Sequence, residues 1–340
     1  MTIGIPFLAV LLLSLLAYLA TRALIPWLVR RQVVDHPNTR GSHTRTIPRG
    51  GGVVIIVGGI SLALVIAAFV KVNWFFVIAA LWGAWALLGW IDDLVDVPAS
   101  RRLWVQCLLS VLTVVLLGWV DRLDWSQEGA VALGWLGPVI TVIGIMWLVN
   151  LTNFMDGIDG LAVSQAIVAL LSWGFWFFML GGNELAWLCW GIAALCYGFL
   201  WLNWQPAQVF LGDVGSTGLG FLFALLVVIG HNRYGIPVLS SLSLLMVFIA
   251  DAMLTLVRRW RAGAKLSEAH RDHYYQRWVD NGYSHRTVTS VYGGMMIICS
   301  LAATLSLMMP SITGLVFGAL AVSASGLAYW ASVTLAKRVH

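Results

Sequence analysis

Apolar stretches of about 20 residues follow one another along almost the whole chain, separated by short polar breaks. A stretch of that length can cross the hydrocarbon core of a bilayer as a helix. The period-two alternation of a membrane β-barrel is absent, and lipid tolerates only helices or closed barrels. The pattern therefore predicts an all-α, polytopic integral membrane bundle with about eleven transmembrane helices, at residues 4–29, 53–71, 74–91, 103–120, 137–152, 160–180, 185–203, 214–231, 236–257, 287–309 and 312–336.

The breaks are too short to hold a soluble domain, so we expect residues 1–340 to form a single integral membrane domain. The first apolar run lacks a preceding basic segment and is longer than the apolar part of a signal peptide, so we expect it to be retained as a helix. The chain is 60% hydrophobic and 10% charged, and its net charge is +5. Without a soluble basic module, this charge is poor evidence for nucleic-acid binding.

Lysine and arginine are distributed unevenly between alternate loops. One set of loops and the C-terminal tail carry sixteen of these residues, and the other set carries three. By the positive-inside rule, the C-terminus is predicted to lie in the cytoplasm and the N-terminus on the periplasmic side. Five loops then share the cytoplasmic face, at residues 30–52, 92–102, 152–160, 203–216 and 258–286.

Short acidic runs occur in three of these loops. Asp92 and Asp93 are adjacent, and neighbouring carboxylates repel each other unless cations or hydrogen bonds offset them. Asn153, Asp156 and Asp159 follow at a spacing of three, which would place them on one side of a helix. In the third run, Asp213 stands among small residues at the start of an apolar stretch. This suits Mg²⁺, which uses one or two carboxylates, waters and substrate phosphates.

The first and last of the five loops are basic. In the first, Arg49 precedes three consecutive glycines, which allow a ligand to approach the backbone closely. The last contains His270, Arg271 and His273. No further soft ligand accompanies the two histidines, which argues against zinc, whereas arginine and histidine together suit a phosphate. Taken alone, each loop could equally be an ordinary solvated basic loop.

Carboxylates and cations at a membrane surface favour the transfer of a phosphorylated group from a soluble nucleotide diphosphate to a lipid phosphate. Asp92, Asp93 and Asp96 would also suit the prenyl-diphosphate site of an aromatic prenyltransferase. That class of enzyme needs a second Asp-x-x-x-Asp motif in the other half of the chain, and Asp251 has no second aspartate at that spacing. A membrane transporter, the alternative of another class, would place its charges near the bilayer midplane, whereas these lie at the ends of the apolar stretches.

The same motifs resemble the polyprenyl-phosphate N-acetylhexosamine-1-phosphate transferase family, of the glycosyltransferase family 4 type, over essentially the whole chain. The resemblance rests on the Asp92–Asp93 pair, on the Asn-x-x-Asp-Gly-x-Asp-Gly run at 153–160, on the Asn-x-x-Pro-Ala-x-Val-Phe-x-Gly-Asp-x-Gly-Ser run at 203–216, and on the histidines of the last loop. One departure is Asp272, which stands where relatives often carry a histidine.

The resemblance implies a role for each matched residue. Asp92 or Asp93 would activate the lipid phosphate, Asp213 would bind Mg²⁺, with Mn²⁺ as the alternative metal, and Phe210 would stack near the uracil. The implied catalytic residues are Asp92, Asp93, Asp156 and Asp159, and the implied substrate-binding residues are Asn153, Asn203, Phe210, His270, Arg271, His273, His43 and Arg49. An aspartate acting as a base and one acting as a covalent nucleophile both remain open.

The implied reaction joins undecaprenyl phosphate to a UDP-N-acetylhexosamine in the bacterial cytoplasmic (inner) membrane and releases UMP. The first loop, with Ser42-His43 and Pro48 to Gly52, is similar to the branch that initiates O-antigen, part of lipopolysaccharide. That branch implies a 6-deoxy sugar such as N-acetylfucosamine or N-acetylquinovosamine, with GlcNAc as a further option. The alternative is a phospho-N-acetylmuramoyl-pentapeptide transferase. The sugar, and the choice between monomer and homodimer, stay open.

Overall fold

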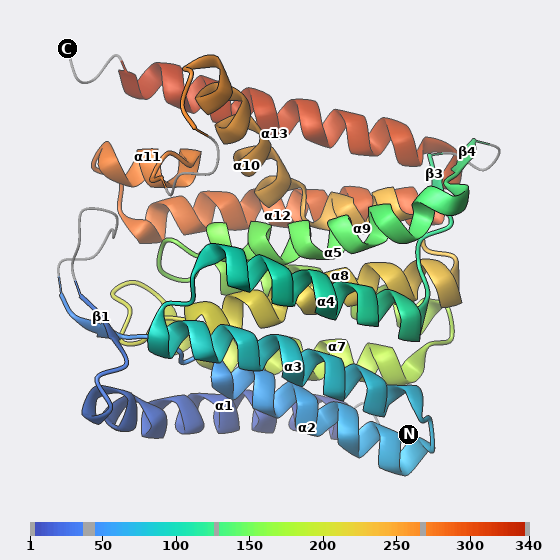
Figure 1. Cartoon of the computed structure of the whole chain (residues 1–340), viewed down its shortest axis with the longest axis horizontal. Helices are drawn as coiled ribbons and strands as arrows, with labels where there is room; N and C mark the ends of the chain where they lie inside the picture. The colour runs from blue at the N-terminus through green and yellow to red at the C-terminus, as the bar shows by residue number, and fades with distance from the viewer. Residues whose placement is uncertain (1–3, 37–44, 126–128, 266–269, 337–340) are drawn as a thin grey trace.

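The computed structural model describes residues 4–36, 45–125, 129–265 and 270–336, and helices make up almost all of it (Figure 1). The helices are α1 (Gly4–Arg30), α2 (Val53–Val70), α3 (Trp74–Val95), α4 (Ala99–Leu117), α5 (Gly137–Phe154), α6 (Leu161–Met179), α7 (Asn183–Asn203), α8 (Gly212–Tyr234), α9 (Val238–Leu244), α10 (Met246–Arg261), α11 (Tyr274–Asp280), α12 (His285–Met308) and α13 (Thr313–Ala336). Two short antiparallel pairs complete it, β1 (Val34–Asp35) with β2 (Ile47–Pro48) and β3 (Arg122–Asp124) with β4 (Ala130–Ala132).

Within the described ranges, nine helices are long and apolar enough to cross a membrane, or up to ten if a bent pair counts as one span. The prediction of an all-α polytopic membrane protein is confirmed. The prediction of one helix over 236–257 is wrong, because α9 and α10 meet at an angle of 83°. The stretch predicted at 312–336 folds as the helix α13.

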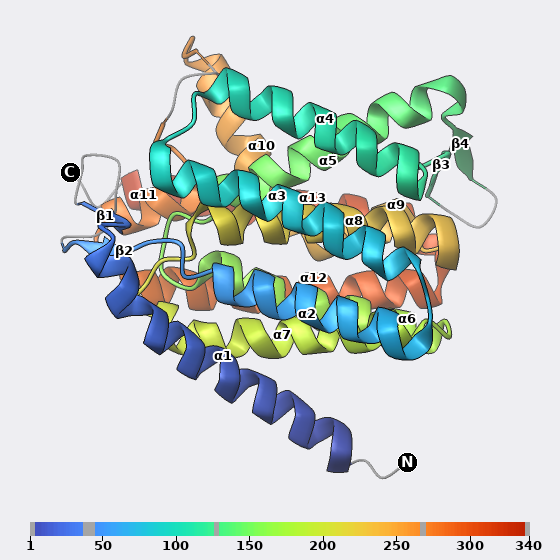
Figure 2. The same ribbon diagram turned by 60° about the horizontal axis from the view of Figure 1, so that its bottom comes forward.

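The described residues of the five predicted loops lie at one end of the bundle. In both ribbon views, α11 and β1 mark this end, and the β3–β4 hairpin lies at the opposite end (Figures 1 and 2). Successive helices run in opposite directions, so the acidic runs that end α3 and α5 and the one that begins α8 reach the same surface. Which side of the membrane this end faces remains the prediction from the lysine and arginine distribution.

The helix α8 is the centre of the bundle, and every residue from Val214 to His231 is buried. Small residues let its neighbours approach closely. A Cβ atom at Gly89 of α3 would lie 2.4 Å from the carbonyl oxygen of Asp213, and one at Gly220 of α8 would lie 2.8 Å from the Cα of Val149 in α5. The backbones of α3 and α5 therefore pack directly against α8, which fixes the three acidic segments relative to one another.

Candidate active site

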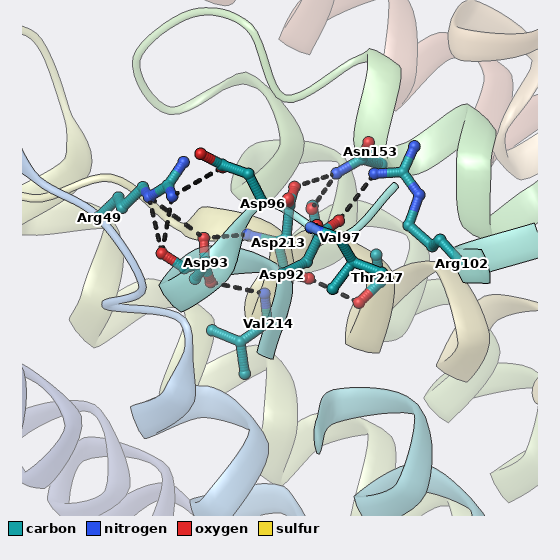
Figure 3. Close-up of polar contacts among 11 residues, drawn as sticks. Arg49, Asp92, Asp93, Asp96, Val97, Arg102, Asn153, Asp213, Val214 and Thr217 are labelled. Carbon is teal, nitrogen blue, oxygen red and sulfur yellow. Dashed lines mark hydrogen bonds and ion pairs between the residues drawn. The ribbon is translucent and has the colours of Figure 1, made fainter. Parts of the chain in front are cut away.

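The side chain of Asp93, at the end of α3, caps the start of α8. Its Oδ1 accepts a hydrogen bond from the Asp213 N–H, and its Oδ2 accepts one from the Val214 N–H, both at 2.9 Å (Figure 3). The first N–H groups of a helix have no partner within the helix, and the helix dipole favours a negative charge there. Asp93 is 3% exposed, so this buried carboxylate holds the turn that carries Asp213.

The loop before α2 reinforces this arrangement. Arg49 donates hydrogen bonds to the Asp93 carbonyl oxygen, at 3.1 and 2.7 Å, and pairs with Asp96 at 3.2 Å. The Gly51 N–H donates to the Phe210 carbonyl oxygen at 3.0 Å. The glycines that were expected to approach a ligand therefore approach the backbone of the α7–α8 loop. His43 lies outside the described residues.

Asp92 makes different contacts from its neighbour. Its Oδ2 pairs with Arg102 at 2.8 Å, and its Oδ1 accepts a hydrogen bond from the Val97 N–H at 2.7 Å. The Asp92 carboxylate is also close enough to Asp213 for the two negative charges to repel each other. The two adjacent aspartates therefore point to different partners, and an arginine cation stands beside the carboxylates of Asp92 and Asp213.

Asn153, at the end of α5, joins this cluster from the other side. Its amide nitrogen donates to Asp213 Oδ1 at 2.5 Å and to Ser216 Oγ at 2.9 Å. The Thr217 hydroxyl group donates to the Asp213 carbonyl oxygen at 2.5 Å (Figure 3). The amide and the hydroxyl group thus hold the Asp213 side chain and the first turn of α8 in place.

The Asp156 carboxylate has no hydrogen bond or ion pair to any of the described residues. Burial, followed by the negative charges of Asp213, Asp93 and Asp159, raises the pKa of Asp156 well above its ordinary value. Both effects disfavour the charged form of the carboxyl group. Asp156 is partly exposed, so a cation could reach its carboxylate and offset this penalty.

The expectation that Asn153, Asp156 and Asp159 share one helical side is wrong, because α5 ends at Phe154 and the following residues form a turn. Asp159 points to another part of the protein. Its Oδ2 accepts a hydrogen bond from the Ala207 N–H, and its Oδ1 contacts His285 Nδ1, both at 3.1 Å. It therefore connects the α5–α6 and α7–α8 loops.

Asn203 is placed in a similar way. Its amide nitrogen donates to the Val209 carbonyl oxygen at 2.9 Å, and its Oδ1 accepts a hydrogen bond from the Gly160 N–H at 3.1 Å. Both Asp159 and Asn203 are buried. Their contacts shape the two loops around the cluster, while Phe210 is partly exposed and held by backbone hydrogen bonds to the loop before α2.

The histidine loop packs against the α5–α6 turn. The rings of His270 and His273 are stacked with their centroids 5.2 Å apart, and the His273 ring lies 6.5 Å from that of Phe154. The Tyr275 hydroxyl group donates to the Phe154 carbonyl oxygen at 2.8 Å. The loop therefore stands beside the turn that carries Asp156. Arg271, in the same loop, pairs with Asp280 at 2.8 Å.

Asp272 anchors the histidine loop to α10. Its carboxylate pairs with Arg259 at 2.5 Å and with Arg258 at 3.3 Å. Partial burial opposes ionisation, but the Arg259 hydrogen bond and the charges of both arginines outweigh it and lower the pKa of Asp272. The residue at which this sequence departs from the family motif thus has a definite structural partner.

Three residues that contact the predicted site were missed by sequence reasoning. Arg102 pairs with Asp92, His285 with Asp159, and Asp251 with His273 at 3.0 Å. A signal existed for Arg102, a cation at the start of the helix that follows Asp92. The other two pairs join residues more than twenty positions apart, and no spacing rule connects them.

Within the described residues, no group of three or more His, Cys, Asp or Glu side chains is arranged to hold a metal ion. The donor set nevertheless fits Mg²⁺. Asp213, Asp156 and the Asn153 amide offer oxygen atoms, and Mg²⁺ typically uses one or two carboxylates and completes its shell with waters and substrate phosphates. Four carboxylates gather here beside two arginines, which leaves negative charge for a divalent cation to offset.

Comparison with known proteins connects this geometry to a family. Residues 74–231, from the start of α3 almost to the end of α8, match the model for glycosyl transferase family 4. The chain is 27% identical to a probable undecaprenyl-phosphate N-acetylglucosaminyl 1-phosphate transferase of Bacillus subtilis, over 79% of this chain and 76% of that protein. It is 29% identical to a phospho-N-acetylmuramoyl-pentapeptide-transferase of Moorella thermoacetica, over 75% and 82% of the two chains.

A third relative extends over most of the sequence. It is a decaprenyl-phosphate N-acetylglucosaminephosphotransferase of Mycolicibacterium smegmatis, 27% identical over 93% of this chain and 86% of its own length. The family model includes Asp92, Asp93, Asn153, Asp156 and Asp213, the residues that converge at the start of α8. Residues 74–231 therefore belong to glycosyl transferase family 4, and the chain as a whole is similar to polyprenyl-phosphate N-acetylglucosamine-1-phosphate transferases.

Proposed function

We propose that the protein transfers an N-acetylhexosamine 1-phosphate from a UDP-sugar to undecaprenyl phosphate and releases UMP. The observation that carries this proposal is the convergence of Asp92, Asn153, Asp156 and Asp213 at one end of a membrane bundle. A lipid phosphate at the membrane surface and a water-soluble nucleotide can both reach such a position. The activities named for the Bacillus subtilis and Mycolicibacterium smegmatis relatives support the same reaction.

In this reaction, an oxygen of the lipid phosphate attacks the β-phosphorus of the UDP-sugar. A new P–O bond forms, the P–O bond between the β-phosphorus and the bridging oxygen breaks, and UMP leaves with that oxygen. Reactions of this kind depend on positioning and on offsetting phosphate charge. Arg102, which is paired with Asp92 beside Asp213, is the cation placed to attract a phosphate to this cluster.

We propose different roles for the four carboxylates. Asp213 and Asp156 hold Mg²⁺, which when bound offsets the charge of the pyrophosphate. Asn153 orients Asp213 through the hydrogen bond of 2.5 Å. Asp93 positions the start of α8, because both of its oxygens accept backbone hydrogen bonds. Asp92, in contact with Arg102, faces the lipid phosphate.

The proposal also states which side of the membrane the site faces and which sugar it transfers. The lysine and arginine distribution supports a site that faces the cytoplasm from the inner membrane. The first-loop residues Ser42-His43 and Pro48 to Gly52 support a role in O-antigen synthesis with GlcNAc or a 6-deoxy N-acetylhexosamine. The Moorella thermoacetica relative favours a second candidate, phospho-N-acetylmuramoyl-pentapeptide transfer.

A product assay separates these candidates. Purified protein is mixed with undecaprenyl phosphate, Mg²⁺ and one nucleotide sugar at a time, including UDP-GlcNAc, UDP-N-acetylquinovosamine, UDP-N-acetylfucosamine and UDP-N-acetylmuramoyl-pentapeptide. The proposal expects UMP and a lipid-pyrophosphoryl sugar with a UDP-N-acetylhexosamine. UMP formation with the pentapeptide substrate alone would support the second candidate, and release of UDP would contradict both.

A further inference from the structure

A pair of amide side chains joins α4 to α5 inside the bundle. The amide nitrogen of Asn150 in α5 donates to Gln106 Oε1 of α4 at 2.8 Å. It also donates to the Met146 carbonyl oxygen at 2.7 Å, one turn back in its own helix. Gln106 is fully buried, and both residues lie within candidate membrane spans, Ala99–Leu117 and Gly134–Phe154. Polar side chains at this depth are costly in lipid, which favours a functional role for the pair.

The Met146 carbonyl oxygen determines how the two amide groups are oriented. A carbonyl oxygen only accepts hydrogen bonds, so the nitrogen of the Asn150 amide must face it. The second hydrogen of the same NH₂ group is donated to Gln106 Oε1. The remaining amide atom of Gln106, Nε2, is buried and has no hydrogen-bond partner among the described residues. The pair therefore forms one hydrogen bond between helices and leaves one buried donor unsatisfied.

The stability of the bundle does not explain this pair. Hydrogen bonds between helices in a membrane contribute modestly on average. A buried donor without a partner costs free energy, which offsets that contribution. Replacement of both partners of a buried pair by apolar groups of the same shape can be nearly neutral or stabilising. Two apolar side chains would therefore serve the packing of α4 against α5 equally well.

The position of the pair connects it to the candidate active site. On α4, Gln106 follows Arg102 by four positions, and on α5, Asn150 precedes Asn153 by three. Residues three or four apart share one face of a helix. The two helices lie side by side, and Arg102 and Asn153 reach the carboxylate cluster from them (Figures 2 and 3). The amide pair therefore joins α4 and α5 one turn away from the two residues that contact the cluster.

Arg102 and Asn153 hold two different carboxylates of the cluster. Arg102 pairs with Asp92 at 2.8 Å, and Asn153 donates to Asp213 Oδ1 at 2.5 Å. A slide of α4 along α5 by one residue would displace Arg102 by about 1.5 Å relative to Asn153. A displacement of about 1 Å can cost roughly 10²-fold in rate. The register of α4 on α5 therefore determines how the two carboxylates are held relative to each other.

We propose that Gln106 and Asn150 are positioning residues for the transfer reaction. Their hydrogen bond fixes the register of α4 on α5, as a single buried polar residue fixes the register of packed helices. It thereby keeps Arg102 and Asn153 at the separation that the reaction requires, without contact to a substrate. This inference rests on the proposed function, because the separation matters for the transfer of a sugar phosphate.

The test separates stability from rate with Gln106→Met, Asn150→Leu and the double variant in the full-length protein. Each single variant leaves a polar atom of the other amide without its partner, so its unfolding temperature should fall. The double variant contains neither amide, so its unfolding temperature should return to the wild-type value or exceed it. Loss of a residue that orients a metal ligand typically costs about 10–100-fold in activity, so we expect kcat to be lower by that order in all three variants.

Ser110→Ala is the matched control. Ser110 is fully buried one turn further along α4, and its hydroxyl group donates at 2.8 Å to the Gln106 carbonyl oxygen within its own helix. Because it makes no contact of this kind with α5, the control should keep the wild-type kcat.

Recovery of both stability and kcat in the double variant would overturn the proposal, because the pair would then be purely structural. A wild-type kcat in either single variant, or an equal loss of kcat in Ser110→Ala, would overturn it as well. A double variant as unstable as the single variants would also count against it, since the pair would then be needed for stability itself. Absence of transfer by the wild-type protein with every UDP-sugar would instead refute the proposed function.

Discussion

The variant Asp93→Asn tests whether Asp93 positions the start of α8, in contrast to carboxylates that act directly on metal or substrate. Asparagine keeps the shape of the side chain, but it has one acceptor oxygen where Asp93 has two, and it has no charge. One of the N–H groups of Asp213 and Val214 would lose its partner. The NH₂ group would then face a backbone N–H, and the start of α8 would have to shift.

The magnitude follows from these contacts. A buried donor without a partner costs about 1–3 kcal/mol. We therefore expect Asp93→Asn to lower the free energy of unfolding by about 1–3 kcal/mol. Because Asp213 moves with the turn, and a displacement of about 1 Å can cost roughly 10²-fold in rate, kcat should fall by that order.

The assay pairs thermal unfolding in detergent with UMP release, and Asp156→Asn is the matched control. The chemical change is identical, but the Asp156 carboxylate accepts no hydrogen bond from the described residues. We expect the control to lose activity and to keep or raise its unfolding temperature. The reasoning would be refuted if Asp93→Asn unfolded at the wild-type temperature, or if Asp156→Asn were the less stable of the two variants.

The remaining predictions concern pH, metal and the loops. Burial and like charges raise the pKa of Asp156 in the folded protein above its unfolded value of about 4. The neutral carboxyl group therefore contributes stability below a pH of about 4, and this stability is lost as the pH rises through the folded pKa. Without added metal, unfolding temperature should fall over that range in wild type and less in Asp156→Asn, and equal slopes would contradict this. Chelation of Mg²⁺ should abolish UMP release, and Mg²⁺ should raise the unfolding temperature of wild type but not of Asp213→Ala. An equal rise in that variant would remove Asp213 as the ligand. Asp159→Asn should lower stability by about 1–3 kcal/mol through the lost contact with Ala207 or His285, with a smaller effect on kcat than Asp156→Asn. A larger loss of kcat in Asp159→Asn than in Asp156→Asn would instead indicate that Asp159 acts directly in the reaction.

The spans and the common face of the acidic runs could be predicted because they depend on local patterns. Apolar length identifies a membrane helix, and alternating helix direction then brings the ends of α3 and α5 to the start of α8. The 83° bend between α9 and α10 was missed, since apolar length alone does not record the direction of a helix. The bend occurs at Leu245, within a continuous apolar stretch.

The roles of single carboxylates depend on contacts between distant segments. Asp92 and Asp93 are adjacent in the sequence, yet one pairs with Arg102 and the other caps α8. Asp159 was grouped with Asp156 by helical spacing, and the end of α5 at Phe154 separates them. Asp251 was noted only as an acid without a motif partner, because His273 and Tyr292, which contact it, lie more than twenty positions away.

The most direct test of the central claim is the identity of the nucleotide released by the purified protein. With undecaprenyl phosphate, Mg²⁺ and a UDP-N-acetylhexosamine, we predict UMP in amounts equal to the lipid-pyrophosphoryl sugar formed, and none when the lipid phosphate is left out. Release of UDP, or of UMP without the lipid phosphate, would contradict the assignment of this end of the bundle as a sugar-phosphate transfer site.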